Sequence, residues 1–90
     1  SASTRKFNKA ADELMQTPGD GHVYCWSITG NHNSYRDCKN EDAKDDIDFC
    51  ITTLSKKHPR RIRLAVAKDL LESCMLEHGW SRYEYMFITD

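Results

Sequence analysis

Apolar residues recur at helical spacing in two well-defined stretches of the chain. In residues 3–16 apolar positions return every three or four residues and charged positions fall between them. Residues 40–57 carry one apolar stripe, which consists of Ala43, Ile47, Cys50, Ile51 and Leu54. Acids crowd the first turns of this second stretch and two lysines end it, a polarity that complements the helix dipole. Both stretches are predicted to be amphipathic helices.

A third apolar stretch, residues 59–79, permits two interpretations. Its apolar residues form two neighbouring rows at helical spacing, Pro59 suits a first helical position, and Gly79 suits the position after a helix end. Residues 60–66 also alternate between apolar and polar in the manner of a strand. We favour a helix from Pro59, because Ala, Leu, Arg and Lys dominate the stretch. Its wide apolar arc predicts a central position.

Two segments have the pattern of β-strands. Residues 22–29 show almost no polar alternation, as in a strand covered on both faces. Residues 80–88 are rich in aromatic and β-branched residues. The short segment 34–38 could form a return strand. The order α-β-β-α-α-β predicts an α+β fold. We expect one domain, residues 1–90, with a small antiparallel sheet of two or three strands packed against three helices. Strand 80–88 should pair with 22–29 and bury Trp26.

Composition narrows the cellular setting. The chain has 90 residues, 39% of them apolar, and a formal net charge of −1. It contains no apolar run of about 18 residues, so we expect no membrane span and no membrane partner. The first 15 residues lack the apolar core of a signal peptide. We therefore expect a cytoplasmic protein.

The cysteines add a second compartment signal. They are Cys25, Cys38, Cys50 and Cys74. An even number permits disulfides, but most of these cysteines fall at apolar positions, where a free thiol behaves as a small hydrophobe. In an intracellular protein this pattern predicts reduced, structural cysteines. Disulfides and metal ligation remain as alternatives.

The sequence contains no convincing catalytic or metal motif. Cys25, His32 and Cys38, with His22 as a fourth ligand, lack the paired short spacing of zinc fingers and ribbons. A nucleophile formed by Cys38 and His32 has neither a glycine-rich loop nor a nucleophile elbow to support it. We predict no catalytic residues, no metal and no cofactor, and thus a non-enzymatic protein. A Cys/His metal or thiol site is the remote alternative.

A basic run interrupts this nearly neutral chain at residues 56–63. Its cations are Lys56, Lys57, Arg60, Arg61 and Arg63, and no acid lies among them. The acids gather instead in residues 41–48. In an antiparallel helix pair the two groups would lie roughly 22 Å apart, beyond a Debye length. We therefore expect two separate patches, of which the basic one faces an acidic protein or the phosphates of a nucleic acid.

Aromatic residues on the strands suggest a second surface. The candidates for an interface are Tyr24, Trp80, Tyr83 and Tyr85. Exposed aromatics are typical of protein interfaces, and an open edge of strand 80–88 could pair with a second copy in a homodimer. The first hypothesis is a small regulator, adaptor or inhibitor that acts through protein–protein contacts. The second is a nucleic-acid-binding protein that uses the basic run.

Overall fold

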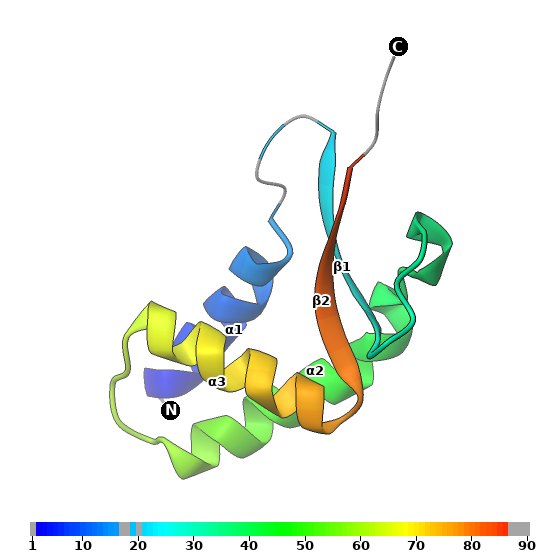
Figure 1. Ribbon diagram of the computed structural model, residues 1–90. Helices are drawn as coiled ribbons and strands as arrows, with labels where there is room; N and C mark the ends of the chain where they lie inside the picture. The colour runs from blue at the N-terminus through cyan, green and yellow to red at the C-terminus, as the bar shows by residue number, and fades with distance from the viewer. Residues whose placement is uncertain (1, 17–18, 20, 87–90) are drawn as a thin grey trace.

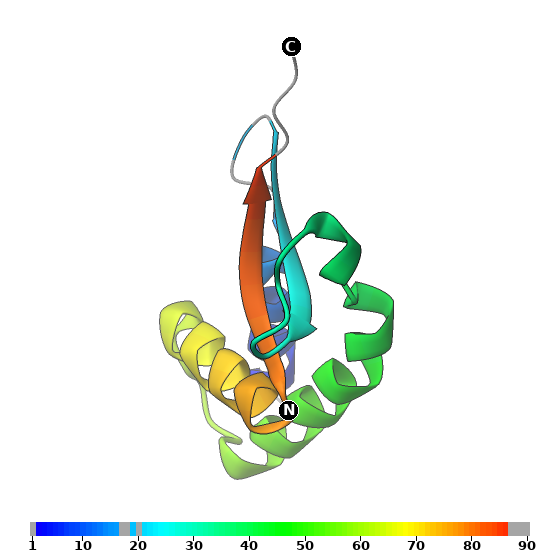
Figure 2. The ribbon, with the colours of Figure 1, turned by 45° about the vertical axis from the view of Figure 1, so that its right-hand side comes forward.

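A computed structural model describes residues 2–16, 19 and 21–86. Its elements are α1 (Ala2–Leu14), β1 (His22–Ile28), the 3₁₀ helix η1 (Tyr35–Asp37), α2 (Asn40–Lys57), α3 (Leu64–Glu77) and β2 (Trp80–Met86). Three helices and a two-stranded antiparallel sheet confirm the predicted α+β class. The helices gather at one end, and the ribbon of β1 and β2 stands on them (Figures 1 and 2).

The two strands pair as predicted. β1 and β2 are antiparallel, with Trp26 opposite Arg82. Trp26 is 2% exposed and lies on the sheet face that packs on the helices. The core around it consists mainly of Phe7, Ala10 and Leu14 from α1, Cys50, Ile51 and Leu54 from α2, Ala67, Leu71 and Met75 from α3, and Trp80 from β2. Helix α3 contacts α1, α2 and β2, and α2 contacts α1, α3 and β1, so the two helices share the central position.

The start of α3 differs from the prediction. Helix α2 has the predicted bounds, but α3 begins at Leu64 instead of Pro59. Residues 60–63 are therefore neither helix nor strand. Proline disfavours a helical conformation for the residue before it, which separates the two helices. Ile62 packs against the core from this connection, so the chain uses these residues to cross from the end of α2 to the start of α3.

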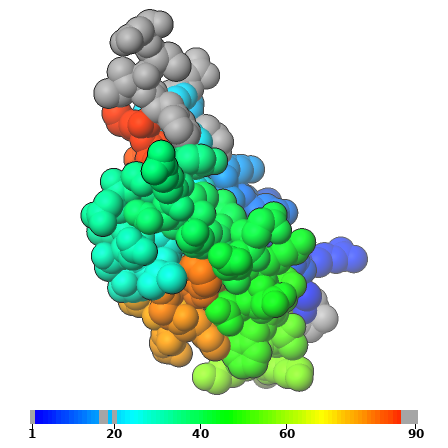
Figure 3. Space-filling model, turned by 90° about the vertical axis from the view of Figure 1, so that its right-hand side faces the viewer, coloured from blue at the N-terminus to red at the C-terminus, as the bar shows by residue number. Residues whose placement is uncertain are grey.

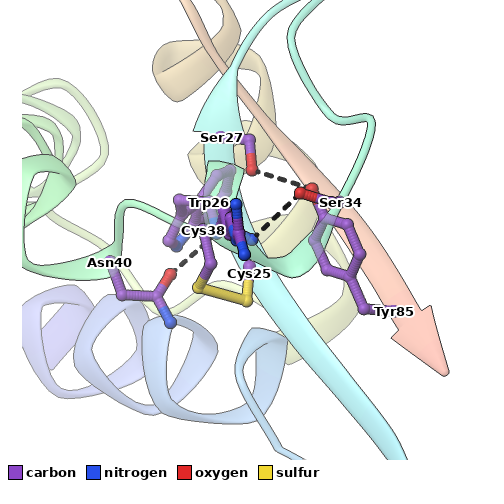
Figure 4. The surroundings of a disulfide bond; sticks show 8 residues. Cys25, Trp26, Ser27, Ser34, Cys38, Asn40 and Tyr85 are labelled. Carbon is purple, nitrogen blue, oxygen red and sulfur yellow. Dashed lines mark hydrogen bonds between the residues drawn. A yellow bond between two sulfur atoms is a disulfide. The ribbon is translucent and has the colours of Figure 1, made fainter. Parts of the chain in front are cut away.

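Segment 34–38 is not a strand. It contains η1, which a capping box begins: the Ser34 hydroxyl accepts a hydrogen bond from the backbone of the first turn, and the Asp37 carboxylate accepts from the Ser34 N–H. These local hydrogen bonds favour a turn over a sheet ladder. The segment 38–40 then covers part of the outer edge of β1. The Trp26 N–H donates to Asn40 Oδ1 at 2.7 Å, and the Lys39 N–H donates to the Trp26 carbonyl at 2.8 Å (Figure 4).

The expectation of reduced cysteines is wrong. Cys25 is bonded to Cys38, and Cys50 is bonded to Cys74, with Cα–Cα distances of 5.2 and 5.9 Å. The apolar positions of these residues were interpreted correctly, since Cys25 and Cys50 are fully buried. The apolar faces of α2 and α3 meet each other, however, and this brings the sulfurs of Cys50 and Cys74 together.

Candidate anion-binding site

Three segments far apart in the sequence meet at one end of the helical layer. They are the first turns of α1, the end of α2 and the connection 58–63, which lie together in Figure 1. The Ser3 hydroxyl donates to the Ser55 carbonyl at 3.4 Å, which ties the start of α1 to the end of α2. Both serines are buried. The N-terminal turns of α1 are thereby held beside the predicted basic run.

This end of the molecule collects positive charge. We call it the basic end and define it by eight cations: Arg5, Lys6, Lys9, Lys56, Lys57, Arg60, Arg61 and Arg63. They are eight of the thirteen lysines and arginines in the chain, and neither residues 1–11 nor residues 49–68 contain an acid. A chain with a net charge of −1 therefore carries a strongly positive surface at one end.

The surface of the basic end is hollowed. An open hollow of about 750 Å³ is lined by Ala2, Arg5, Lys6, Lys9, Arg61 and Ile62. Four cations from two separate segments thus surround one concavity, and two apolar residues complete the lining. The volume falls in the range of ligand sites. Because Ala2 is the first residue of α1, the positive end of the helix dipole adds to the potential there.

In the part of the chain that the structure describes, most of these cations have no carboxylate that neutralises them. Lys9 Nζ lies 4.0 Å from Glu13 Oε2, and the other oxygen of Glu13 binds Lys68 at 2.9 Å. Within the described residues, the other seven cations of the basic end have no carboxylate within salt-bridge distance. The hollow therefore keeps a positive potential that attracts anions. Its two guanidinium groups, on Arg5 and Arg61, can each hold a carboxylate or phosphate with paired hydrogen bonds.

The predicted basic residues form only part of this site. Arg61 lines the hollow. The other four residues are exposed and lie before or after Arg61 in the sequence: Lys56, Lys57, Arg60 and Arg63. Sequence reasoning missed Arg5, Lys6 and Lys9, which it placed on the solvent face of a helix. The available signal was the absence of acids in the first eleven residues. The acids of α2 lie in its first half, between Glu41, roughly 24 Å from Lys57 along the helix, and Asp48, roughly 14 Å from it.

The predicted aromatic surface is mostly covered. Trp80 is buried, at 8% exposure, and its Nε1–H donates to Asp46 Oδ2 at 2.7 Å. Tyr24 lies beneath the Arg82 guanidinium, 4.4 Å from its ring centre. These two aromatics are on the side of the sheet that packs on the helices, which explains why Trp80 is not available as an interface residue.

The other sheet face lies under the segment that follows β1. The His32 ring stacks on Tyr83 at 3.8 Å, and Tyr35 meets the Tyr85 ring edge-on at 6.2 Å. The Cys25–Cys38 bond fastens this segment to β1 (Figure 4). Figure 3 shows the resulting face, on which the segment lies beside α2. Tyr83 and Tyr85 are therefore half-buried and do not form an open aromatic platform.

The cysteines and histidines that the sequence offered as metal ligands all have other partners in the structure. Cys25 and Cys38 are bonded to each other, His32 stacks on Tyr83, and His22 Nδ1 lies 3.0 Å from Glu84 Oε2. Among the described residues, the metal-type side chains that converge are Cys50, Cys74 and His78.

Comparison with known proteins does not add to this geometry. No described helix is both long enough and apolar enough to cross a membrane. No protein-family model, curated protein sequence or solved structure matches the chain. The functional argument therefore depends on the residues of the basic end.

Proposed function

We propose that this chain is a non-enzymatic binding protein that captures an acidic segment of another protein with its basic end. The observation that supports this most directly is the hollow at α1, where four cations from two segments face one space. A regulator, adaptor or inhibitor acts in this way, because it recognises a partner and needs no reacting group. Carboxylates of the partner would enter the hollow, and the surrounding cations would steer its approach.

Two disulfides in 90 residues favour an oxidising compartment. This proposal replaces the cytoplasmic location that the sequence pattern led us to expect. A protein in such a compartment meets acidic protein surfaces more readily than nucleic acid. The compartment therefore supports the choice of a protein as partner.

The side chains of the basic end also favour a protein over a nucleic acid. Proteins that bind single strands place aromatic rings where bases can stack. The segments of the basic end contain no tyrosine or tryptophan, and their one phenylalanine, Phe7, is fully buried. The tyrosines of the strands lie elsewhere, under His32 and η1. Nucleic-acid binding remains the second candidate, because the arginines would bind phosphate as well as carboxylate.

Fluorescence anisotropy can separate the two candidates. A labelled peptide rich in Asp and Glu is titrated with the protein, and single- and double-stranded oligonucleotides of equal charge are titrated in parallel. We expect the peptide to bind more tightly at physiological salt. We also expect Arg61→Glu to weaken its binding at least tenfold, since a charge-assisted hydrogen bond contributes about 1.5–3 kcal/mol.

Arg36→Glu is the matched control for this substitution. Arg36 is exposed in η1, away from the basic end, and its replacement changes the net charge by the same amount (Figure 1). It should leave peptide affinity nearly unchanged. Equal losses from the two variants would show that only net charge matters, and would reject the basic end as the site. Tighter binding of the oligonucleotides would favour the second candidate.

A further inference from the structure

Helices α2 and α3 face each other with metal-type side chains in matching positions. Asp46 and Cys50 are four residues apart on α2. Cys74 lies in the last turn of α3, and His78, four residues later, caps that helix. Residues with this spacing lie on one side of a helix. Across the helix pair, Cys50 is bonded to Cys74, and His78 Nδ1 lies 3.6 Å from Asp46 Oδ1. The four side chains therefore form one cluster.

The dimensions of this cluster suit a small cation. A ligand atom from each of Cys50, Cys74 and His78 lies within 4.8 Å of the other two. In a tetrahedral zinc site, with Zn–S of about 2.3 Å and Zn–N of about 2.0–2.1 Å, the ligand atoms lie roughly 3.5–3.8 Å apart. The three ligand atoms are therefore within about 1 Å of a tetrahedral arrangement, which forms when the two sulfurs separate and the imidazole moves slightly toward them.

We propose that Cys50, Cys74 and His78 bind a divalent cation of the zinc class once the Cys50–Cys74 disulfide is reduced. The same two sulfurs then join α2 to α3 in both redox states, directly in the oxidised chain and through the metal in the reduced one. Two thiolates and an imidazole are the ligands that such cations prefer. This inference does not use the charges of the basic end, and it concerns the chain under reducing conditions rather than in the oxidising compartment proposed above.

Asp46 is a positioning residue in this site. Its Oδ2 accepts a hydrogen bond from the buried Trp80 at 2.7 Å, which fixes the carboxylate, and its Oδ1 faces the His78 ring. A carboxylate that holds the second nitrogen of a ligating histidine sets the orientation of the ring. Three protein ligands leave one position of a tetrahedral ion for water.

The chemistry requires a dithiol reductant. The reductant supplies two electrons and two protons, the Cys50–Cys74 bond breaks, two thiols form, and the reductant becomes its own disulfide. The metal then displaces the two thiol protons to water, and each thiolate donates an electron pair to the metal. Access is through His78, whose side chain is 34% exposed beside the half-buried Cys74. Cys50 lies on the buried side.

Cobalt titration of the reduced chain tests the proposal. The Cys25→Ser/Cys38→Ser double variant is used because Cys50 and Cys74 are then its only cysteines. The variant is reduced with a dithiol, and the excess reductant is removed under argon. Co²⁺ is then added stepwise, followed by Zn²⁺. We expect one equivalent of Co²⁺, a thiolate-to-cobalt charge-transfer absorption, and its loss on displacement by Zn²⁺. The oxidised protein should show none of this absorption.

Two histidine variants assign the third ligand. His78→Ala should weaken cobalt binding more than tenfold, whereas His32→Ala, at the exposed histidine on Tyr83, should not change it. Asp46→Asn should weaken it by about 10–100-fold. If reduction unfolds the chain, Zn²⁺ should restore the helical circular-dichroism signal in the Cys25→Ser/Cys38→Ser variant. It should not restore that signal when His78→Ala is added. A reduced chain that neither absorbs with Co²⁺ nor refolds with Zn²⁺, or equal effects of the two histidine variants, would overturn the proposal.

Discussion

Asn40 shows how one side chain can join two parts of the fold. Its Oδ1 accepts the Trp26 N–H at 2.7 Å, so the outer edge of β1 is closed by the first residue of α2. Trp26 is buried beneath the helices. The hydrogen bond therefore fixes the distance between the sheet and α2, and also satisfies a donor that has no strand partner on this side.

Replacing Asn40 should destabilise the protein. In Asn40→Ala the Trp26 N–H has no acceptor, and an unsatisfied buried donor costs about 1–3 kcal/mol. We expect the free energy of unfolding in urea to fall by that amount. Asn31→Ala, in the exposed turn after β1, is the control and should change stability by less than about 0.5 kcal/mol. Equal stability of the two variants would show that the Asn40 contact contributes nothing.

At the scale of elements, the sequence predicts what depends on local pattern. The bounds of α2 follow from its apolar stripe, its acidic first turns and its two terminal lysines. The start of α3 could not be predicted in this way. Ile62 lies before the helix and packs on the core, and the spacing of apolar residues does not indicate that contact. The disulfides could not be predicted for the same reason: each cysteine has an apolar position, but its partner depends on how two elements dock.

Removing a disulfide should measure how strongly the docked elements depend on it. For Cys50→Ala/Cys74→Ala we expect the free energy of unfolding to fall by about 2–4 kcal/mol, because the unfolded chain regains the freedom that the cross-link removed. Urea unfolding of the oxidised proteins gives this value. Thiol titration of the denatured, unsubstituted protein should find no free thiol, since all four cysteines are in disulfides. Free thiols at Cys50 and Cys74 would contradict the assigned pairing.

At the scale of the whole molecule, charge is distributed as a dipole that the net charge of −1 conceals. The basic end lies at the end of α2, and five acids, Glu41, Asp42, Asp45, Asp46 and Asp48, lie toward its start. The sequence predicted two separate patches. It could not predict the hollow, since that requires α1 and the connection 58–63 to meet, and they are about fifty residues apart in the chain.

The salt dependence of peptide affinity should show that binding uses the basic end. Affinity for an acidic peptide should fall steeply as ionic strength rises, because the contacting charges are exposed and screened. Anisotropy titrations at several salt concentrations measure the dependence. Lys44→Glu, at the acidic half of α2, should leave the slope unchanged, whereas Lys6→Glu should reduce it. A flat salt response of the parent would mean that the basic end is not the contact surface.

The most direct test asks whether Arg5 and Arg61 act on one ligand. They line the same hollow from α1 and from the connection before α3. A double-mutant cycle with Arg5→Ala, Arg61→Ala and the pair, measured as peptide affinity by anisotropy, gives their interaction energy. If both guanidinium groups hold the same acidic segment, the losses will deviate from additivity by more than about 0.5 kcal/mol. Strictly additive losses would mean that the two guanidinium groups hold different groups of the ligand. No loss in either single variant would contradict a binding site at the basic end.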